Sequence, residues 1–383
     1  MKKIVIAMDS FKGSLSSAEA ASFIERGIHE FHPEICVLKV PVADGGEGTV
    51  HALIGATGGV VCRVTVSDPL NRPVFADYGV LGNGETAVIE MASASGLTLL
   101  DKTEQNPMVT SSYGTGELIL SALNRGCRNF LIGIGGSATN DAGTGMLEAL
   151  GYRFLDKNGK IVSGCGGHLS IIQEIDDSDV HPALSESHFK VACDVDNPFY
   201  GLNGAAYVFA KQKGATHEMI NELDFGLKCF ADLIKRRKGI DLMRIAGSGA
   251  AGGMGGAFYS FLNAELISGI DMILDAIDFK KQIAGADLIF TGEGRMDFQT
   301  LSGKTPLGVL KRAKLQNIPV VALCGAIYDY EKLNKAGFKA ILSIQTEAVS
   351  LEKAMIKEYA GNNLKNTVIQ IINLIEMKES SCL

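Results

Sequence analysis

Short apolar runs recur along the chain, and each ends in Gly, Asp or Ser. They are rich in Val, Ile and Leu, which is typical of parallel strands covered by helices on both faces. The runs cover residues 4–8, 36–40, 130–134, 287–291, 319–324 and 339–344. Apolar residues with a helical period fill residues 17–31, 116–123, 216–238 and 305–316. Strands that alternate with helices predict an α/β fold.

Residues 60–99 depart from this pattern. Residues 60–67 and 74–81 alternate apolar and polar side chains around a turn with two prolines, and residues 86–92 follow Gly-Asn-Gly. This pattern indicates an antiparallel meander. We therefore predict two α/β domains with the active site in the cleft between them. A doubly wound, parallel-sheet domain of Rossmann or flavodoxin type would comprise residues 1–62 and 285–383, and an inserted mixed α/β domain would comprise residues 63–284.

Composition narrows the class of protein. Hydrophobic residues make up 46% and charged residues 21%, as in ordinary globular proteins. The net charge is −7 and the basic residues are spread out, which argues against a nucleic acid or an anionic membrane as partner. The apolar start is shorter than a secretory signal, and no apolar run approaches the ~18 residues of a membrane span. We expect a cytoplasmic monomer or homodimer that acts on small molecules.

Gly- and Asp-rich loops follow the first two predicted strands, and ligands bind beyond the carboxyl ends of strands in such sheets. Residues 9–14 contain Lys12 and two serines, which suit an anion, although a helix cap with a solvated lysine would look the same. Residues 43–49 place Asp44 and Glu47 among three glycines. These carboxylates could hold Mg²⁺ or hydroxyl groups, and such residues are also common in turns.

A third loop follows the strand at residues 130–134 and precedes an apparent helix at residues 146–150. Its exposed N–H groups predict a phosphate cradle. A dinucleotide fingerprint is the weaker interpretation, because Asp156, the acidic residue it would need, falls in an apparent hairpin turn. The expected nucleotide contacts are Gly133, Gly135, Gly136, Ser137, Thr139, Asn140 and Asp141.

Two further stretches resemble nucleotide motifs without meeting their requirements. Residues 247–256 contain Gly-x-Gly-x-x-Gly after a poor strand, so close packing of a helix on a sheet explains them equally well. Residues 291–305 end in Ser-Gly-Lys-Thr, but Phe298 stands where a P-loop needs glycine. The second stretch still gathers cations, carboxylates and hydroxyls at a strand end, and residues 193–198 form another acidic loop.

Together, these stretches resemble the glycerate kinase type 1 family. The matches keep their order from residue 4 to about residue 325. They are Asp-Ser-Phe-Lys-Gly-Ser-Leu-Ser at 9, Pro-Val-Ala-Asp-Gly-Gly-Glu-Gly-Thr at 41, Gly-Thr-Gly-Glu-Leu-Ile at 114, Gly-Ile-Gly-Gly-Ser-Ala-Thr-Asn-Asp at 133, Cys-Asp-Val-Asp-Asn-Pro at 193, Gly-Ala-Ala-Gly-Gly at 249 and Thr-Gly-Glu-Gly-Arg-Met-Asp at 291. The chain departs from the family at residues 210–211, where Ala-Lys replaces the commoner Gly-Pro, and at Phe298, which fills a usually small position.

The resemblance implies a kinase that uses ATP and Mg²⁺ to phosphorylate D-glycerate, and most bacterial relatives are thought to make 2-phosphoglycerate. Phosphoryl transfer needs cations on the phosphates, a metal and a carboxylate that accepts the hydroxyl proton. The expected catalytic residues are Asp194, Lys12, Asp44 and Asp297, with Asp44 and Asp297 also expected on the metal and Lys304 on ATP. The expected substrate contacts are Ser10, Lys12, Arg72, Glu47 and Arg295. Phosphorylation at C3, a nucleotide-linked oxidoreductase and a non-enzymatic small-acid sensor stay open as alternatives.

Overall fold

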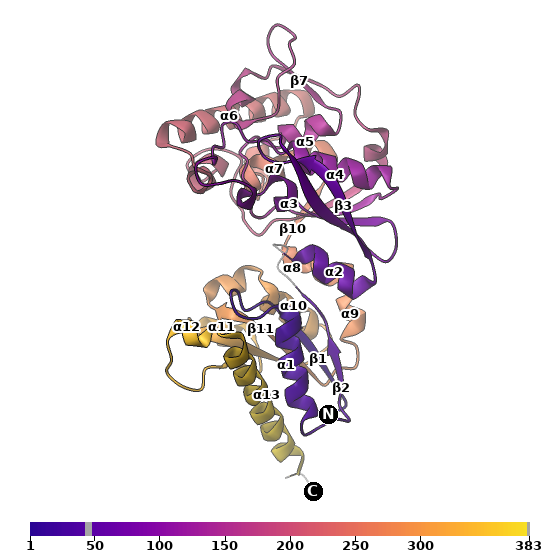
Figure 1. Cartoon of the computed structure of the whole chain (residues 1–383), viewed down its shortest axis with the longest axis vertical. Coiled ribbons are helices and arrows are strands. Elements are labelled where there is room, and N and C mark those ends of the chain that lie inside the picture. The colour runs from indigo at the N-terminus through magenta and orange to yellow at the C-terminus, as the bar shows by residue number, and fades with distance from the viewer. Residues whose placement is uncertain (43–47, 381–383) are drawn as a thin grey trace. The chain divides into compact units, whose positions relative to one another are not determined.

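The computed structural model describes residues 1–42 and 48–380. The chain divides into two compact units (Figure 1). Unit 1 comprises Met1–Asp44 and Ile273–Leu383, and unit 2 comprises Gly45–Met272. Residues 48–62 thus belong to unit 2 rather than to the discontinuous domain predicted for them, because helix α2 (Thr49–Thr57) packs on strands of unit 2. Residues 273–284 belong to unit 1, where α9 (Phe279–Gln282) packs on α10.

The sheet of unit 1 is parallel, with the order β13-β12-β11-β1-β2. Its strands are β1 (Lys3–Met8), β2 (Cys36–Lys39), β11 (Leu288–Met296), β12 (Val320–Ile327) and β13 (Ala340–Ser343). The chain runs outward from β1 to β2 and, in the opposite direction, from β11 to β13. The switch point of this doubly wound sheet therefore lies between β1 and β11, which is where such sheets bind ligands. The predicted α/β fold class is confirmed.

Helices cover the sheet of unit 1. Besides α9 they are α1 (Ser17–His29), α10 (Thr305–Lys314), α11 (Tyr330–Ala336), α12 (Leu351–Ala354) and α13 (Lys357–Ser380). α1 begins at a capping box in which Ser16 and Glu19 bond each other's backbone N–H groups. α1 and α13 lie side by side (Figure 1), and their apolar faces pack on alternate strand residues such as Ile4, Ile6 and Phe290.

Unit 2 is built on a mixed sheet with the order β10-β9-β6-β5-β4-β3. Its strands are β3 (Val60–Ser67), β4 (Pro73–Val80), β5 (Thr86–Glu90), β6 (Asn129–Gly133), β9 (His188–Ala192) and β10 (Glu265–Ile267), and β7 (Arg153–Leu155) with β8 (Glu174–Asp176) forms a separate hairpin. The β3–β4–β5 meander is antiparallel, as predicted. β5, β6, β9 and β10 are parallel and end in register, so the loops that follow them share one edge of the sheet.

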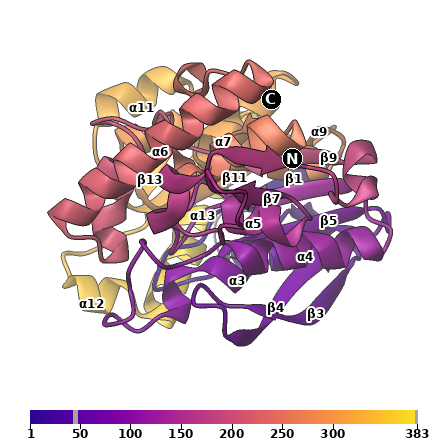
Figure 2. The same ribbon diagram turned by 90° about the horizontal axis from the view of Figure 1, so that it is seen from above.

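The helices of unit 2 include α4, which packs against α5 beside the sheet (Figure 2). They are α2, α3 (Ala92–Ser95), α4 (Tyr113–Asn124), α5 (Thr144–Ala149), α6 (His217–Lys238) and α7 (Ala250–Leu262); α8 (Gly269–Ala276) contains the boundary to unit 1. Shorter turns are η1 (Leu97–Leu99), η2 (Gly166–Ile171), η3 (Pro182–Glu186), η4 (Ala206–Ala210), η5 (Lys211–Lys213), η6 (Leu242–Arg244) and, in unit 1, η7 (Phe298–Ser302). Among the described residues, no helix combines the length and apolar character that a membrane crossing requires.

Candidate active site

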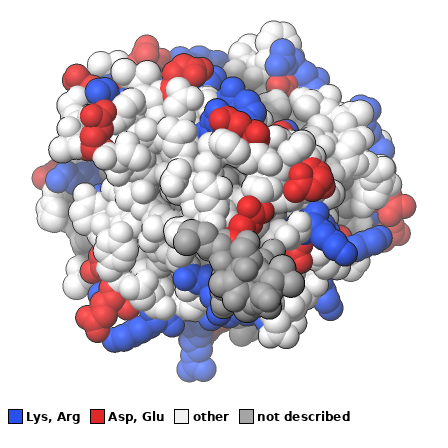
Figure 3. Space-filling model, turned by 90° about the horizontal axis from the view of Figure 1, so that it is seen from below, with Lys and Arg blue, Asp and Glu red and all other residues white. Residues whose placement is uncertain are grey.

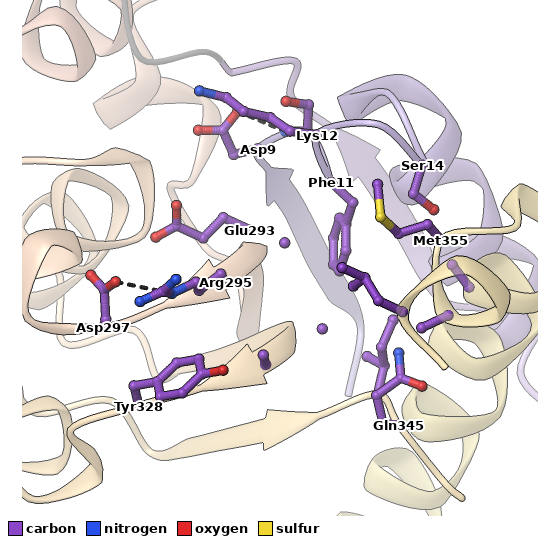
Figure 4. A pocket seen from close by; sticks show the side chains of 18 of the residues that line it. Asp9, Phe11, Lys12, Ser14, Glu293, Arg295, Asp297, Tyr328, Gln345 and Met355 are labelled. Carbon is purple, nitrogen blue, oxygen red and sulfur yellow. Dashed lines mark hydrogen bonds and ion pairs between the residues drawn. The ribbon is translucent and has the colours of Figure 1, made fainter. Parts of the chain in front are cut away.

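A pocket of about 930 Å³ lies in unit 1, where the loops after β1 and β11 flank the switch point (Figure 4). One side is polar and carries Glu293, Arg295 and Asp297, whereas Phe11 and Met355 line the opposite side. The charged lining residues are Asp9, Lys12, Glu293, Arg295, Asp297, Lys304 and Glu347. The pocket thus offers apolar surface and charged groups to the same ligand.

Glu293 is a buried carboxylate of this pocket. It is 8% exposed, accepts a hydrogen bond from the Thr300 hydroxyl (2.7 Å) and lies 3.7 Å from the Lys304 ammonium. Burial raises the pKa of Glu293, and the carboxylates of Asp9 and Asp297 add to that rise. Thr300 and Lys304 act in the opposite direction. A further cation near these carboxylates would therefore be stabilised.

Arg295 is held in place by two neighbours. Its Nε lies 3.2 Å from Asp297 Oδ2, and its guanidinium carbon lies 4.5 Å from the centre of the Tyr328 ring. The β1 loop is fixed in a similar way, because the Thr305 hydroxyl at the start of α10 donates to Asp9 Oδ2 (2.7 Å). These contacts order the polar groups before any ligand binds, which favours tight and selective binding.

The structure places many of the predicted site residues in this pocket. Ser10, Lys12, Arg295, Asp297 and Lys304 all line it. The predictions for Asp44 and Glu47 fall on residues 43–47, which lie outside the described residues.

Arg72 lies in unit 2 and already has two carboxylate partners. Its Nε donates to Asp68 Oδ2 and its Nη1 to Glu104 Oε1, both at 2.6 Å. These hydrogen bonds, with that of Glu104 the larger, raise the pKa of Arg72. Asp68 lies in the same turn as Arg72, whereas Glu104 lies 32 residues farther along the chain, so both carboxylates occupy the guanidinium fork that was predicted to bind a substrate carboxylate.

Asp194 also lies in unit 2, directly after β9. Its side chain is exposed, and its Oδ1 accepts a hydrogen bond from the Gly269 N–H (3.0 Å) at the start of α8. β9 is the neighbour of β6, so Asp194 follows the strand beside the one that leads into the predicted phosphate cradle. The Asp194 carboxylate and the glycine-rich loop of residues 133–141 therefore follow neighbouring strands at the same edge of the sheet.

The loop of residues 133–141 is fixed by backbone hydrogen bonds to residues 95–97. Gly136 O accepts from Leu97 N and Ser95 O accepts from Ala138 N, both at 2.9 Å. A Cβ added at Gly135 would meet no atom within 4 Å. The loop is thus rigid, and it has open space at Gly135.

Two buried charged groups support this loop. The Asp141 carboxylate accepts hydrogen bonds from Ser112 N (2.8 Å) and Ser112 Oγ (2.7 Å). Burial raises the pKa of Asp141, and the hydrogen bonds oppose that rise. The Lys213 ammonium donates to Ser137 Oγ (2.7 Å) and Thr139 O (2.6 Å). Lys213 was not among the residues predicted from the sequence for the site.

Residues 247–256 pack closely against the neighbouring loops. A Cβ at Gly249 would lie 2.1 Å from Pro198 O, and a Cβ at Gly252 would lie 2.2 Å from Thr139 O. The segment before them forms η6 rather than a strand. These glycines therefore allow close approach of backbone segments, which was one of the two interpretations left open.

Comparisons with known proteins place the whole chain in one family. The model of the glycerate kinase family matches residues 4–376. The chain is 46% identical to a glycerate kinase of Bacillus subtilis over 99% of both chains. It is also 46% identical to a glycerate 2-kinase of Escherichia coli, over 93% of this chain and 94% of that one. The crystal structure of a candidate glycerate kinase 2 from Salmonella typhimurium LT2 matches with a TM-score of 0.90 and 44% identity, over 99% of both chains. The chain belongs to the glycerate kinase family.

Proposed function

We propose that the chain catalyses ATP-dependent phosphorylation of D-glycerate on the C2 hydroxyl, giving 2-phosphoglycerate and ADP. The observation that carries the choice of C2 is the 46% identity to the E. coli protein named glycerate 2-kinase, which extends over nearly all of both chains. The pocket at the switch point of unit 1 supports a small-molecule substrate, because ligands of open α/β sheets bind at that position.

The nucleotide is proposed to bind in the unit 1 pocket. Its volume of about 930 Å³ is within the range of roughly 300–1,000 Å³ that suits cofactor-sized ligands. The apolar side at Phe11 and Met355 offers a surface for the base (Figure 4), and Lys12, Arg295 and Lys304 offer positive charge for the phosphates. The loop of residues 133–141 provides a further anion-binding surface in unit 2.

The carboxylates of the same pocket suit a Mg²⁺ ion that is also bound to the phosphates of ATP. Mg²⁺ keeps several waters and binds one or two carboxylates together with substrate phosphates. Asp297 and Glu293 supply such carboxylates, whereas no cluster of three or more His, Cys, Asp or Glu that could hold an ion occurs among the described residues. When bound, the ion would neutralise charge that develops on the transferred phosphoryl group.

We propose that Asp194 accepts the proton of the substrate hydroxyl. Lys12, Arg295 and Lys304 would hold the phosphate oxygens, while Arg295 stays oriented by Asp297 and Tyr328. Such positioning is the main contribution of a protein to phosphoryl transfer. We propose the cytoplasm, where ATP is available, as the location of the reaction.

The partners are proposed to be small molecules. On the face drawn in Figure 3, the Lys and Arg side chains are interspersed with Asp and Glu among the described residues. A polyanion such as a nucleic acid needs a continuous basic surface. The charge distribution of this face therefore agrees with the net charge of −7 in favouring small substrates.

The product of the reaction tests the proposed function directly. With D-glycerate, ATP and Mg²⁺, ADP should form and enolase alone should consume the second product, because enolase uses 2-phosphoglycerate. If consumption requires added phosphoglycerate mutase, the acceptor is the C3 hydroxyl. ADP formation that does not depend on D-glycerate would contradict the proposal, and so would a nicotinamide signal at 340 nm without ADP.

The placement of the nucleotide is tested by Lys304→Met. Loss of a hydrogen bond between charged groups should raise the KM for ATP by roughly 10- to 100-fold, because such bonds contribute about 1.5–3 kcal/mol. The KM for D-glycerate should change less than twofold. Lys311→Met is the matched control, since Lys311 is exposed on the same helix and does not line the pocket. Equal KM values for ATP in both variants would remove the nucleotide from this pocket.

A further inference from the structure

Lys213 is a buried lysine beside the glycine-rich loop of unit 2. It is 2% exposed, and its ammonium donates to Ser137 Oγ (2.7 Å) and Thr139 O (2.6 Å). Lysine is almost never fully buried without hydrogen-bonding or ionic partners, because removing an ammonium from water is costly. Both acceptors belong to residues 133–141, so the buried charge serves this loop.

The hydrogen bond to Ser137 determines what the serine hydroxyl can do. A hydroxyl has one donor and two acceptor lone pairs, and an ammonium can only donate. Ser137 therefore accepts from Lys213 and must direct its own proton elsewhere. Among the residues that the structure describes, Ser137 Oγ accepts from Lys213 and donates no hydrogen bond, and Ser137 is 8% exposed. The serine is thus prepared to donate a hydrogen bond to an incoming ligand.

Side chains next to Ser137 have unmet hydrogen-bonding capacity as well. Thr139 Oγ1 and both polar atoms of the Asn140 amide are buried without a partner in the structure. Buried polar groups of this kind normally find a partner, since an unmet one costs about 1–3 kcal/mol. Together with the open space at Gly135, this cluster indicates that the loop completes its hydrogen bonds when a ligand binds.

We propose that Lys213 is a positioning residue that fixes the Ser137 hydroxyl as a donor to an anionic oxygen of a substrate. The inference rests on the proposed kinase function, and it adds Lys213, which the proposed reaction did not use, to the expected contact at Ser137. The anionic oxygen belongs either to a phosphate of ATP or to the carboxylate of D-glycerate. The shared chemistry is an oxyanion that receives a hydrogen bond from a hydroxyl polarised by a buried ammonium.

The protonation state of Lys213 should make substrate affinity depend on pH. Burial lowers the pKa of Lys213 to about 7, and the charge of Asp141 opposes that shift. Among the described residues, Asp141 is the charged group that acts on Lys213, and the Asp141 carboxylate accepts a hydrogen bond from Ser112. The protonated lysine donates a stronger hydrogen bond to Ser137 than the neutral amine does, so substrate affinity should fall as the pH rises through about 7.

Lys213→Met and Ser137→Ala test the proposal in one set of measurements. Each variant should raise the KM for one substrate by roughly 10- to 100-fold and leave the KM for the other within twofold. The affected substrate identifies the oxyanion, ATP for a phosphate and D-glycerate for a carboxylate. The double variant should be no worse than Lys213→Met alone, because both changes remove the same hydrogen bond to the substrate.

The controls separate positioning from a structural role. Lys211→Met alters an exposed lysine in the same turn and should match the wild type. The fall in affinity above about pH 7 should be absent from Lys213→Met. Four results would overturn the proposal. Ser137→Ala could leave both KM values unchanged, or the effects of the two substitutions on KM could simply add in the double variant. Lys213→Met could retain the pH dependence of substrate affinity, or it could raise the KM for both substrates equally and lower the melting temperature. Ser137→Ala decides the question alone if Lys213→Met does not fold. ADP formation by the wild-type protein tests the kinase activity separately.

Discussion

Asp194→Asn is expected to lower kcat by about 10²- to 10⁴-fold, the usual contribution of a positioned general base. Asn can still accept the hydrogen bond from Gly269 N–H that Asp194 Oδ1 receives at 3.0 Å, so the loop after β9 should keep its conformation. The amide cannot accept the proton of the substrate hydroxyl. The KM for D-glycerate and the melting temperature should therefore change little, and steady-state kinetics with thermal melting provide the measurement.

Asp196→Asn is the matched control for this prediction. Asp196 is another exposed carboxylate in the same loop, two residues farther along the chain. Its substitution should leave kcat within a few-fold of the wild type. Full activity in Asp194→Asn, or a loss of the predicted size in Asp297→Asn instead, would assign the base to another carboxylate.

The regular part of the fold could be predicted because burial leaves a clear pattern. The core strands of both sheets appear in the sequence as apolar runs, and the β3–β4 pair appears as strict alternation. β11 extends farther than predicted, to Met296, because its Gly-Glu-Gly-Arg segment has the composition of a loop. Backbone pairing with β12 continues through Arg295 and Met296 all the same. Pairing of backbone groups depends on the neighbouring strand, which a local pattern does not record.

The boundary between the units was harder to predict for a related reason. The apolar residues of α2, such as Val50 and Leu53, show that the helix is buried on one side but not which sheet it covers. Its contacts with β4 and β5 assign it to unit 2. Assignment of a helix to a domain is thus a tertiary property.

Candidate site residues could be predicted from the sequence where they follow strand ends. They could not be predicted where burial in the fold changes the chemistry of a side chain. Ser10, Lys12, Arg295, Asp297 and Lys304 were predicted because their loops follow strand ends, and in the structure they line one pocket. Lys213 was given no role because a lysine in a short polar stretch is usually solvated. The pairing of Arg72 with Glu104 could not be predicted, since Glu104 is distant in sequence and close in the fold.

Gly252→Val is expected to destabilise unit 2 by about 2–5 kcal/mol. Gly252 has a φ of 72°, a left-handed conformation that costs a residue with a side chain about 1–2 kcal/mol. The added Cβ would lie 2.2 Å from Thr139 O and 2.6 Å from Asn140 Cα. Both are backbone atoms that cannot rotate away, and overpacking of this kind costs about 1–3 kcal/mol more. Equilibrium unfolding in urea measures the difference.

Gly135→Val is the matched control, because it adds the same side chain to residues 133–141, the loop against which Gly252 packs, at a position where the Cβ contacts no other atom. A Cβ at Gly135 would meet no atom within 4 Å, and its φ is not positive, so the free energy of unfolding should change by less than about 1 kcal/mol. Activity should fall in both variants for different reasons. Gly252→Val displaces the Thr139 carbonyl that Lys213 binds, whereas Gly135→Val obstructs the ligand and raises KM in a stable protein. Equal stability of the two variants would mean that residues 247–256 do not fix the position of the glycine-rich loop.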